Sequence, residues 1–268
     1  MLKRKLMFSL FTVLALLFTA ICSAHATEKS LKEPRDFRQY LEQQISLSNN
    51  AKQKKSLEMI LEMQKVTEEQ IRRSVKKTEP SELQADDVDV YLGSDCDFYA
   101  AEGGGRGGSG LYSVDFDLNN NRNLVKVWSV INNSSGWAWT GKVFKVNGTG
   151  SQIASFSIEG YYSAYLNFAP DTGAVSIGGV DFKLYDLTED REVASKSIAT
   201  FIPPFDGSGQ TFTENYSRPN VFQVELKAGH YYRAYLITQG YTVINGIFTS
   251  YDLSTNKYSD WYRIQIDF

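Results

Sequence analysis

The chain has 268 residues, of which 42% are hydrophobic and 22% are charged, and its formal net charge is −3. This length and composition can build a sizeable core, which excludes a disordered chain and a small disulfide-stapled domain. The slightly acidic balance also argues against a nucleic-acid binder.

The first 26 residues predict a secretory signal peptide. A basic run at 3–5 precedes an apolar stretch over 6–21, and small residues stand at Ala24 and Ala26. We expect cleavage between Ala26 and Thr27 and export of the mature chain. An uncleaved membrane anchor is the alternative, but the apolar stretch is shorter than the ~20 residues that a spanning helix needs.

Cleavage removes Cys22 and His25 and leaves Cys96 and His230 as the single cysteine and histidine of the mature chain. No intrachain disulfide is then possible, and zinc sites built from several His or Cys ligands are excluded. Cys96 and His230 could work as a thiol–imidazole pair only if the fold brought them together. We expect instead an inert thiol and an exposed histidine.

Residues 27–80 lack glycine and tryptophan and predict a helical extension of two amphipathic helices. Ser48, Asn49 and Asn50 mark the break, and the second helix spans about 51–77 with a net charge of +4. This basic helix could contact an anionic membrane or a wall polymer, or pack on its own domain. The pair of helices could also mediate self-association or form a removable pro-segment.

Acidic residues gather just after the helices. They form the alternating pairs Asp87 with Asp89, Asp95 with Asp97, and Asp115 with Asp117. Residues i and i+2 of a strand share a face, so these pairs could hold a structural calcium ion, although the EF-hand spacing is absent. We expect no other cofactor.

A glycine-rich run over 102–110 matches the letters of the dinucleotide-binding fingerprint. That chemistry needs a helix directly after the loop, and here a strand pattern follows from Leu111. We therefore interpret the run as a flexible connection between strands.

Residues 81–268 predict an antiparallel β-sandwich, either jelly-roll or immunoglobulin-like, so the fold class is all-β with an N-terminal helical extension. Short period-two segments follow one another about every ten residues, with no helical segment between them. Candidate strands span 94–101, 111–118, 124–132, 137–146, 151–159, 161–168, 174–186, 191–202 and 246–252. Segments 222–226 and 232–236 predict a hairpin, and the last strand places Tyr262 on the same apolar face as Ile264 and Phe268.

Aromatic residues are the most prominent candidate for a functional feature, because a hydrophobic core does not obviously account for all of them. Trp137 and Trp139 fall on one face of a predicted strand, where paired rings could stack on sugars. The plain alternative is that they belong to the core.

These observations favour a secreted, non-enzymatic β-sandwich that binds polysaccharide or a cell-surface molecule, with Trp137 and Trp139 as candidate ligand-binding residues. One alternative is a structural or assembly protein that uses its helices. Another is a carboxylate-based glycoside hydrolase, which needs two facing carboxylates; the acidic cluster at 189–192 fits a polar turn better.

Overall fold

The computed structural model describes residues 36–77, 88–129, 132–167, 175–202, 209–243, 249–252 and 258–268. Residues Pro34–Phe268 form one compact unit. The expected signal peptide and its cleavage site lie outside the described residues. Within the described part, neither helix is both long enough and apolar enough to cross a membrane.

Two helices precede the sheets, as predicted. They are α2 (Phe37–Leu47) and α3 (Ala51–Lys76). The Asp36 carboxylate accepts a hydrogen bond from the backbone N–H of Gln39, and Asn50 accepts from those of Lys52 and Gln53. These side chains satisfy amide groups that the first turn of a helix leaves unpaired, which explains why the chain breaks and restarts at Asn50.

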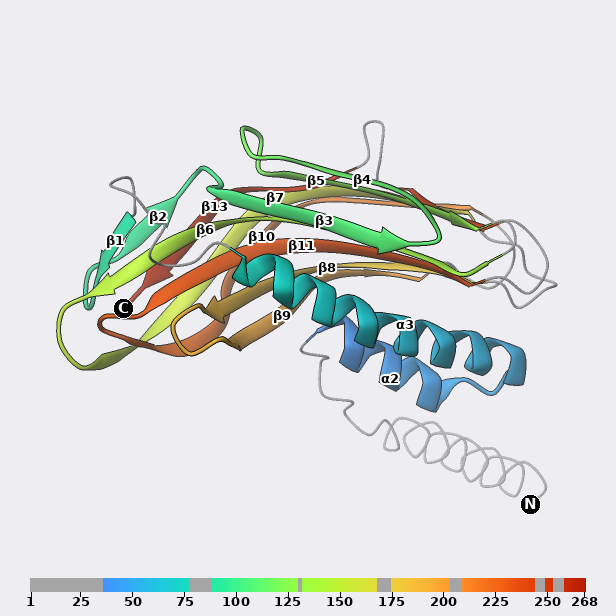
Figure 1. Ribbon diagram of the computed structural model, residues 1–268, viewed down its shortest axis with the longest axis horizontal. Coiled ribbons are helices and arrows are strands. Elements are labelled where there is room, and N and C mark those ends of the chain that lie inside the picture. The colour runs from blue at the N-terminus through green and yellow to red at the C-terminus, as the bar shows by residue number, and fades with distance from the viewer. Residues whose placement is uncertain are drawn as a thin grey trace, which may run out of the picture. The chain divides into compact units, whose positions relative to one another are not determined.

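The rest of the described chain forms two sheets (Figure 1). The first sheet, called sheet A, contains β1 (Val88–Tyr91), β3 (Gly103–Ser109), β6 (Ser134–Asn147), β8 (Val175–Asp186), β9 (Arg191–Phe201) and β11 (Tyr231–Val243). The second, sheet B, contains β2 (Cys96–Phe98), β4 (Leu111–Asp117), β5 (Arg122–Ser129), β7 (Ser151–Asn167), β10 (Gln210–Lys227), β12 (Thr249–Asp252) and β13 (Ser259–Asp267).

The predicted sandwich architecture is confirmed. In sheet A the order is β1-β6-β11-β8-β9, with β3 beside β6, and in sheet B it is β10-β7-β12-β5-β13-β2, with β4 beside β5. All pairs are antiparallel except β1 with β6. The chain crosses between sheets from β6 to β7 to β8, and again from β9 to β10 to β11.

The strand prediction was wrong about how some strands continue and pair. Segments 151–159 and 161–168 are one continuous strand, β7. The predicted hairpin is instead a crossover, because β10 pairs with β7 in sheet B whereas β11 pairs with β6 and β8 in sheet A. The turn at Gly229 has φ +83°, which suits a tight connection of either kind, so alternation alone could not tell them apart.

The main core lies between the sheets and is rich in aromatic rings. Phe182 of sheet A stacks on Phe222 of sheet B with ring centroids 5.1 Å apart. Trp261 is fully buried among the same residues. Burial of this apolar surface is the main force that holds the two sheets together.

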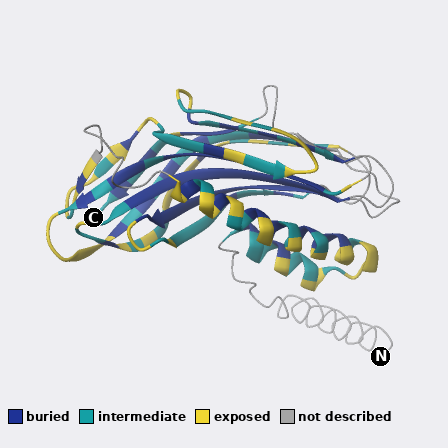
Figure 2. Ribbon diagram, in the orientation of Figure 1, coloured by how far each residue is buried: buried dark blue, intermediate teal, exposed yellow. Residues whose placement is uncertain are grey.

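The outer face of sheet A is covered by the helices (Figure 2). Two apolar clusters fill this layer. In the first, Phe37 of α2 stacks on Tyr241 of β11, with Leu57 and Ile60 of α3 beside them. In the second, Ile71 and Val75 of α3 cover the tryptophans of β6. The helices are therefore a third layer of the fold, with their exposed side chains on the far side.

The glycine-rich run is the edge strand β3 and not a flexible connection, so this expectation was wrong. Gly103 to Ser109 pair with β6 in register, and Gly107 lies opposite Trp137. A Cβ atom on Gly107 would lie 2.6 Å from Cζ2 of Trp137. Glycine is needed in this strand because tryptophan rings and α3 occupy the volume where side chains would stand.

Candidate functional site

Trp137 and Trp139 do share one face of a strand, as expected, but that face lies beneath α3. Their exposed fractions are 3% and 1%. The indole N–H of Trp139 donates to the Ser74 hydroxyl at 3.1 Å, and that of Trp137 donates to Gln70 at 3.4 Å. The expected open platform is thus absent while α3 is in place, and ligand binding by these two rings stays a prediction that requires α3 to move.

The end of α3 is anchored on the same region. Arg233 of β11 is fully buried, lies 5.1 Å from the Trp139 ring and donates a hydrogen bond to the Val75 carbonyl. The last carbonyls of a helix have no partner within it, so a guanidinium there stabilises the helix end. Burial lowers the pKa of Arg233 to about 10, which still leaves it charged at neutral pH.

Between the two apolar clusters, α3 and sheet A line a partly open cavity of about 350 Å³. Its walls combine charged, hydroxyl-bearing and apolar side chains. Lys65, Glu68 and Arg72 line it from α3, and Lys183, Glu192 and Tyr235 line it from sheet A. From the sequence, only Glu192 was considered for a site, as part of the acidic cluster 189–192. The grouping itself was not foreseen, because these residues come together only when the helix packs on the strands.

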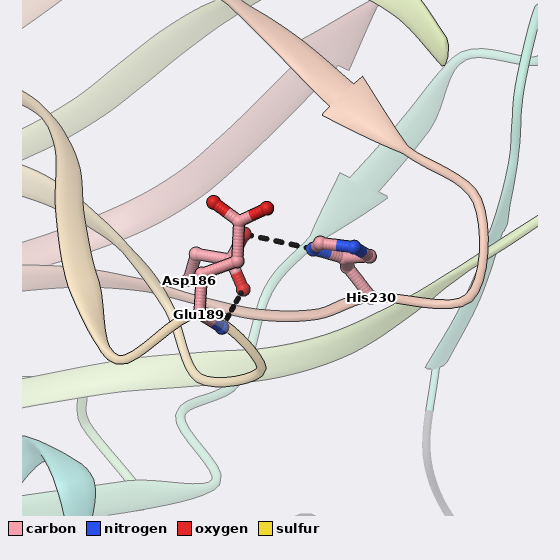
Figure 3. A group of neighbouring side chains, drawn as sticks. All are labelled: Asp186, Glu189 and His230. Atoms are coloured by element: carbon pink, nitrogen blue, oxygen red, sulfur yellow. Dashed lines mark hydrogen bonds and ion pairs between the residues drawn. The ribbon is translucent and has the colours of Figure 1, made fainter. Parts of the chain in front are cut away.

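A second cluster contains side chains that could ligate a metal ion: His230, Asp186 and Glu189 (Figure 3). Their potential ligand atoms lie within 4.8 Å of one another, close enough for a metal ion. The His230 Nδ1 atom lies 2.9 Å from Asp186 Oδ2, while Oδ1 accepts from the backbone N–H groups of Thr188 and Glu189.

The same cluster has a sufficient structural explanation. Lys227 and Arg191 each contact the Glu189 carboxylate at 2.6 Å and lower its pKa to about 2. Each carboxylate oxygen of Glu189 is therefore already bound to a cationic side chain of the protein. The cluster ties the β8–β9 turn to the β10–β11 turn, and His230 is a half-buried partner of Asp186 rather than the exposed residue we expected.

Four of the remaining aspartates have protein partners, and Asp95 accepts from the backbone N–H of Phe268. Asp97 binds Arg263, Asp115 binds Arg106, and Asp117 holds the turn that follows it. Asp87 lies outside the described residues, and a structural calcium ion stays a prediction. Cys96 is half-buried on β2, where burial raises the pKa of its thiol. No hydrogen bond joins it to His230, which is bound to Asp186.

The outer face of sheet B carries a cluster of tyrosines. Asp260 of β13 pairs with Tyr161 of β7 on one side and with Arg122 of β5 on the other. Tyr258 and Tyr262 stand two residues before and after Asp260. We call these five residues the tyrosine face. The Tyr161 and Tyr258 ring centroids are 5.5 Å apart, the Arg122 guanidinium lies 3.8 Å from the Tyr258 centroid, and Tyr262 is 51% exposed.

The sequence analysis missed this face because it placed Tyr262 inside. The register of β13 against β7 shifts between Trp261 and Arg263, a bulge that sends Tyr262 outward and gives Trp261 the buried position. One residue of slip reverses the face of every side chain before it. The sequence signal for this reversal was the adjacent pair Trp261 and Tyr262, because the larger and less polar tryptophan ring is the one expected to be buried.

Asp260 is the charged centre of the tyrosine face. It is only 3% exposed, since the neighbouring rings and Arg122 cover it, and one carboxylate oxygen accepts from the backbone N–H of Tyr161 at 3.0 Å. Burial raises the pKa of Asp260 to about 6. At neutral pH its charge offsets that of Arg122, so the face presents aromatic surface and hydrogen-bonding groups with little net charge.

No known family model matches the chain, and no curated protein matches it. Some solved structures resemble it weakly. One is the TmCBM61 module in complex with β-1,4-galactotriose, to which this chain is 10% identical with a TM-score of 0.22. The match covers 60% of this chain and 86% of that one. This chain is 12% identical to a family 22 carbohydrate-binding module of Clostridium thermocellum Xyn10B, over 59% of this chain and 86% of that one, with a TM-score of 0.25.

The chain is also 11% identical to the enzymatically active domain of tailspike protein 4 of bacteriophage CBA120, with a TM-score of 0.23. That match covers 59% of this chain but only 19% of the phage protein. Similarities this weak assign neither ligand nor activity, so function has to be argued from the chain's own geometry.

Proposed function

We propose that this protein is an exported, non-enzymatic β-sandwich that binds polysaccharide through the tyrosine face of sheet B. The observation that carries the proposal is the open cluster of Tyr161, Tyr258 and Tyr262 around a compensated Arg122–Asp260 pair. It lies on the sheet that the helices do not cover, so a long polymer could reach it without any rearrangement.

The chemistry of the face matches a sugar polymer. Tyrosine rings offer flat apolar surface to the C–H faces of sugar rings, and their hydroxyls can donate or accept at the ring edges. Along β7, the outward positions before Tyr161 carry Ser155, Ser157 and Glu159. A carbohydrate thus meets a row of two serine hydroxyls and one carboxylate that continues from the aromatic cluster, although the serines also bond to Asn220.

The same geometry argues against hydrolysis at this face. Cleavage of a glycosidic bond uses two carboxylates on opposite sides of the scissile bond. In the tyrosine face Asp260 is a single carboxylate, buried and bound to the backbone of Tyr161. We therefore propose binding without turnover.

The test is retention of purified residues 27–268 on insoluble cellulose, chitin, xylan, β-1,3-glucan and peptidoglycan. Retention on at least one polymer, with loss of that retention in Tyr258→Ala/Tyr262→Ala, supports the proposal. Tyr91→Ala/Tyr99→Ala is the matched control, because those tyrosines are 57% and 65% exposed and lie outside the tyrosine face. Release of reducing ends during the same incubation would contradict the non-enzymatic part.

A further inference from the structure

The cavity between α3 and sheet A brings charged and hydroxyl-bearing side chains into a layer that is otherwise apolar. Clusters around Tyr241 and around Trp139 close the layer on either side of it. Lys183 is only 9% exposed and Tyr235 only 2%. Burying such groups costs free energy that apolar residues of similar size would not cost. Packing alone therefore does not explain their presence.

Two of these buried groups have hydrogen-bonding capacity left over. The Lys183 ammonium donates to Glu192 at 3.0 Å, which uses one of its three N–H groups. The Tyr235 hydroxyl can both donate and accept, and the tyrosine ring makes an edge contact with Trp139 at 5.8 Å. Both side chains line the cavity. The remaining donor and acceptor capacity of these two groups is therefore available to a ligand in the cavity.

The charges around the cavity balance one another. Its walls carry three cations, on Lys65, Arg72 and Lys183, and three carboxylates, on Glu68, Glu69 and Glu192. Lys183 is paired with Glu192, and Arg72 with Glu69. Glu68 is paired with Arg38 of α2 at 3.5 Å. Because the three carboxylates are already paired with cations and the two kinds of charge are equal in number, neither an anion nor a cation is favoured.

We infer that this cavity binds a small uncharged sugar, a mono- or disaccharide, independently of the tyrosine face. Hydroxyl groups both donate and accept, so one such ligand can accept from Lys183 and Tyr235 while it donates to Glu192. The volume of about 350 Å³ lies at the lower end of the range for small-molecule sites. The site lies on the opposite sheet from the tyrosine face, so the two can be tested separately.

Tyr235→Phe is the sharpest test, because it removes one oxygen and keeps the ring that packs on Trp139. Calorimetric titration and saturation-transfer NMR would use glucose, galactose, xylose, N-acetylglucosamine, cellobiose and maltose. The parent protein should bind at least one of them, and Tyr235→Phe should weaken that binding about tenfold or more. Without sugar, Tyr235→Phe should unfold at about the same temperature as the parent, because the ring that packs on Trp139 is kept.

Two further variants separate this site from the tyrosine face. Tyr258→Ala/Tyr262→Ala should bind the small sugar as the parent does, even if it loses retention on polysaccharide. Lys183→Met should lose sugar binding while circular dichroism reports a folded chain. The inference is overturned if none of the six sugars binds, if glycine or citrate binds in their place, or if Tyr235→Phe binds sugar as tightly as the parent.

Discussion

The indole N–H of Trp139 donates to the hydroxyl of Ser74, and this bond joins the centre of sheet A to the last turns of α3. The helix therefore packs on the sandwich and is part of its fold. The bond also explains why two tryptophans with the spacing of a surface platform are buried.

The first prediction concerns this helical cover. Ile60 of α3 is fully buried against sheet A, and Ile60→Ala should lower the free energy of unfolding by about 2–5 kcal/mol. Val66→Ala is the control on the same helix, because Val66 is 62% exposed. Urea unfolding followed by tryptophan fluorescence measures both. Equal, small effects of the two changes would mean that α3 does not pack on sheet A.

The second prediction concerns the glycine strand β3. Gly107→Ala should destabilise the protein by about 1–3 kcal/mol, because the new methyl group overlaps the Trp137 ring. Gly103→Ala should be tolerated, since its Cβ would meet Trp139 at an ordinary contact distance of 3.5 Å. Thermal unfolding of the two variants side by side decides the matter, and a tolerated Gly107→Ala would show that the run is a loose connection after all.

The third prediction concerns pH. Asp181 of β8 is 1% exposed beneath the helices, and burial raises its pKa to about 7. An unfolded aspartate has a pKa of about 4, so between pH 4 and pH 7 the folded chain holds a proton that the unfolded chain has released. Stability should therefore fall as pH rises through this range, by a few kcal/mol.

Asp181→Asn should remove most of that fall. Its amide oxygen can still accept the hydrogen bond that Gln239 donates to Asp181. Urea titrations at pH 5 and pH 8 measure the difference for the parent, for Asp181→Asn and for the exposed control Asp115→Asn. Asp260, whose pKa is raised to about 6, adds a smaller fall of the same sign in all three proteins. A parent that is more stable at pH 8 than at pH 5 would refute this account.

How far the sequence predicts the structure depends on whether a feature is local. The break at Asn50 was predictable, because a side chain that caps a helix acts within its own first turn. The strands of the sandwich were predictable for the same reason, since alternation is a property of each segment.

Long-range features were not predictable. Alternation put Trp137 and Trp139 on one face, but it could not say that α3 covers that face. The bulge at Trp261 turned the Tyr262 side chain to the outer face, and nothing in the alternation of apolar and polar residues marks a bulge. The cavity joins Glu68, Lys183 and Tyr235 from three elements, so its charge balance exists only in the folded chain.

The central claim is that the tyrosine face binds polysaccharide, and the most direct measurement is a depletion isotherm on each insoluble polymer. We predict saturable binding of the parent to at least one polymer, and binding at least about tenfold weaker for Tyr258→Ala/Tyr262→Ala. Tyr91→Ala/Tyr99→Ala and the conservative variants Trp137→Phe and Trp139→Phe should bind as the parent does. Parent protein that stays in solution with every polymer, or a tyrosine-face variant that binds unchanged, would contradict the claim.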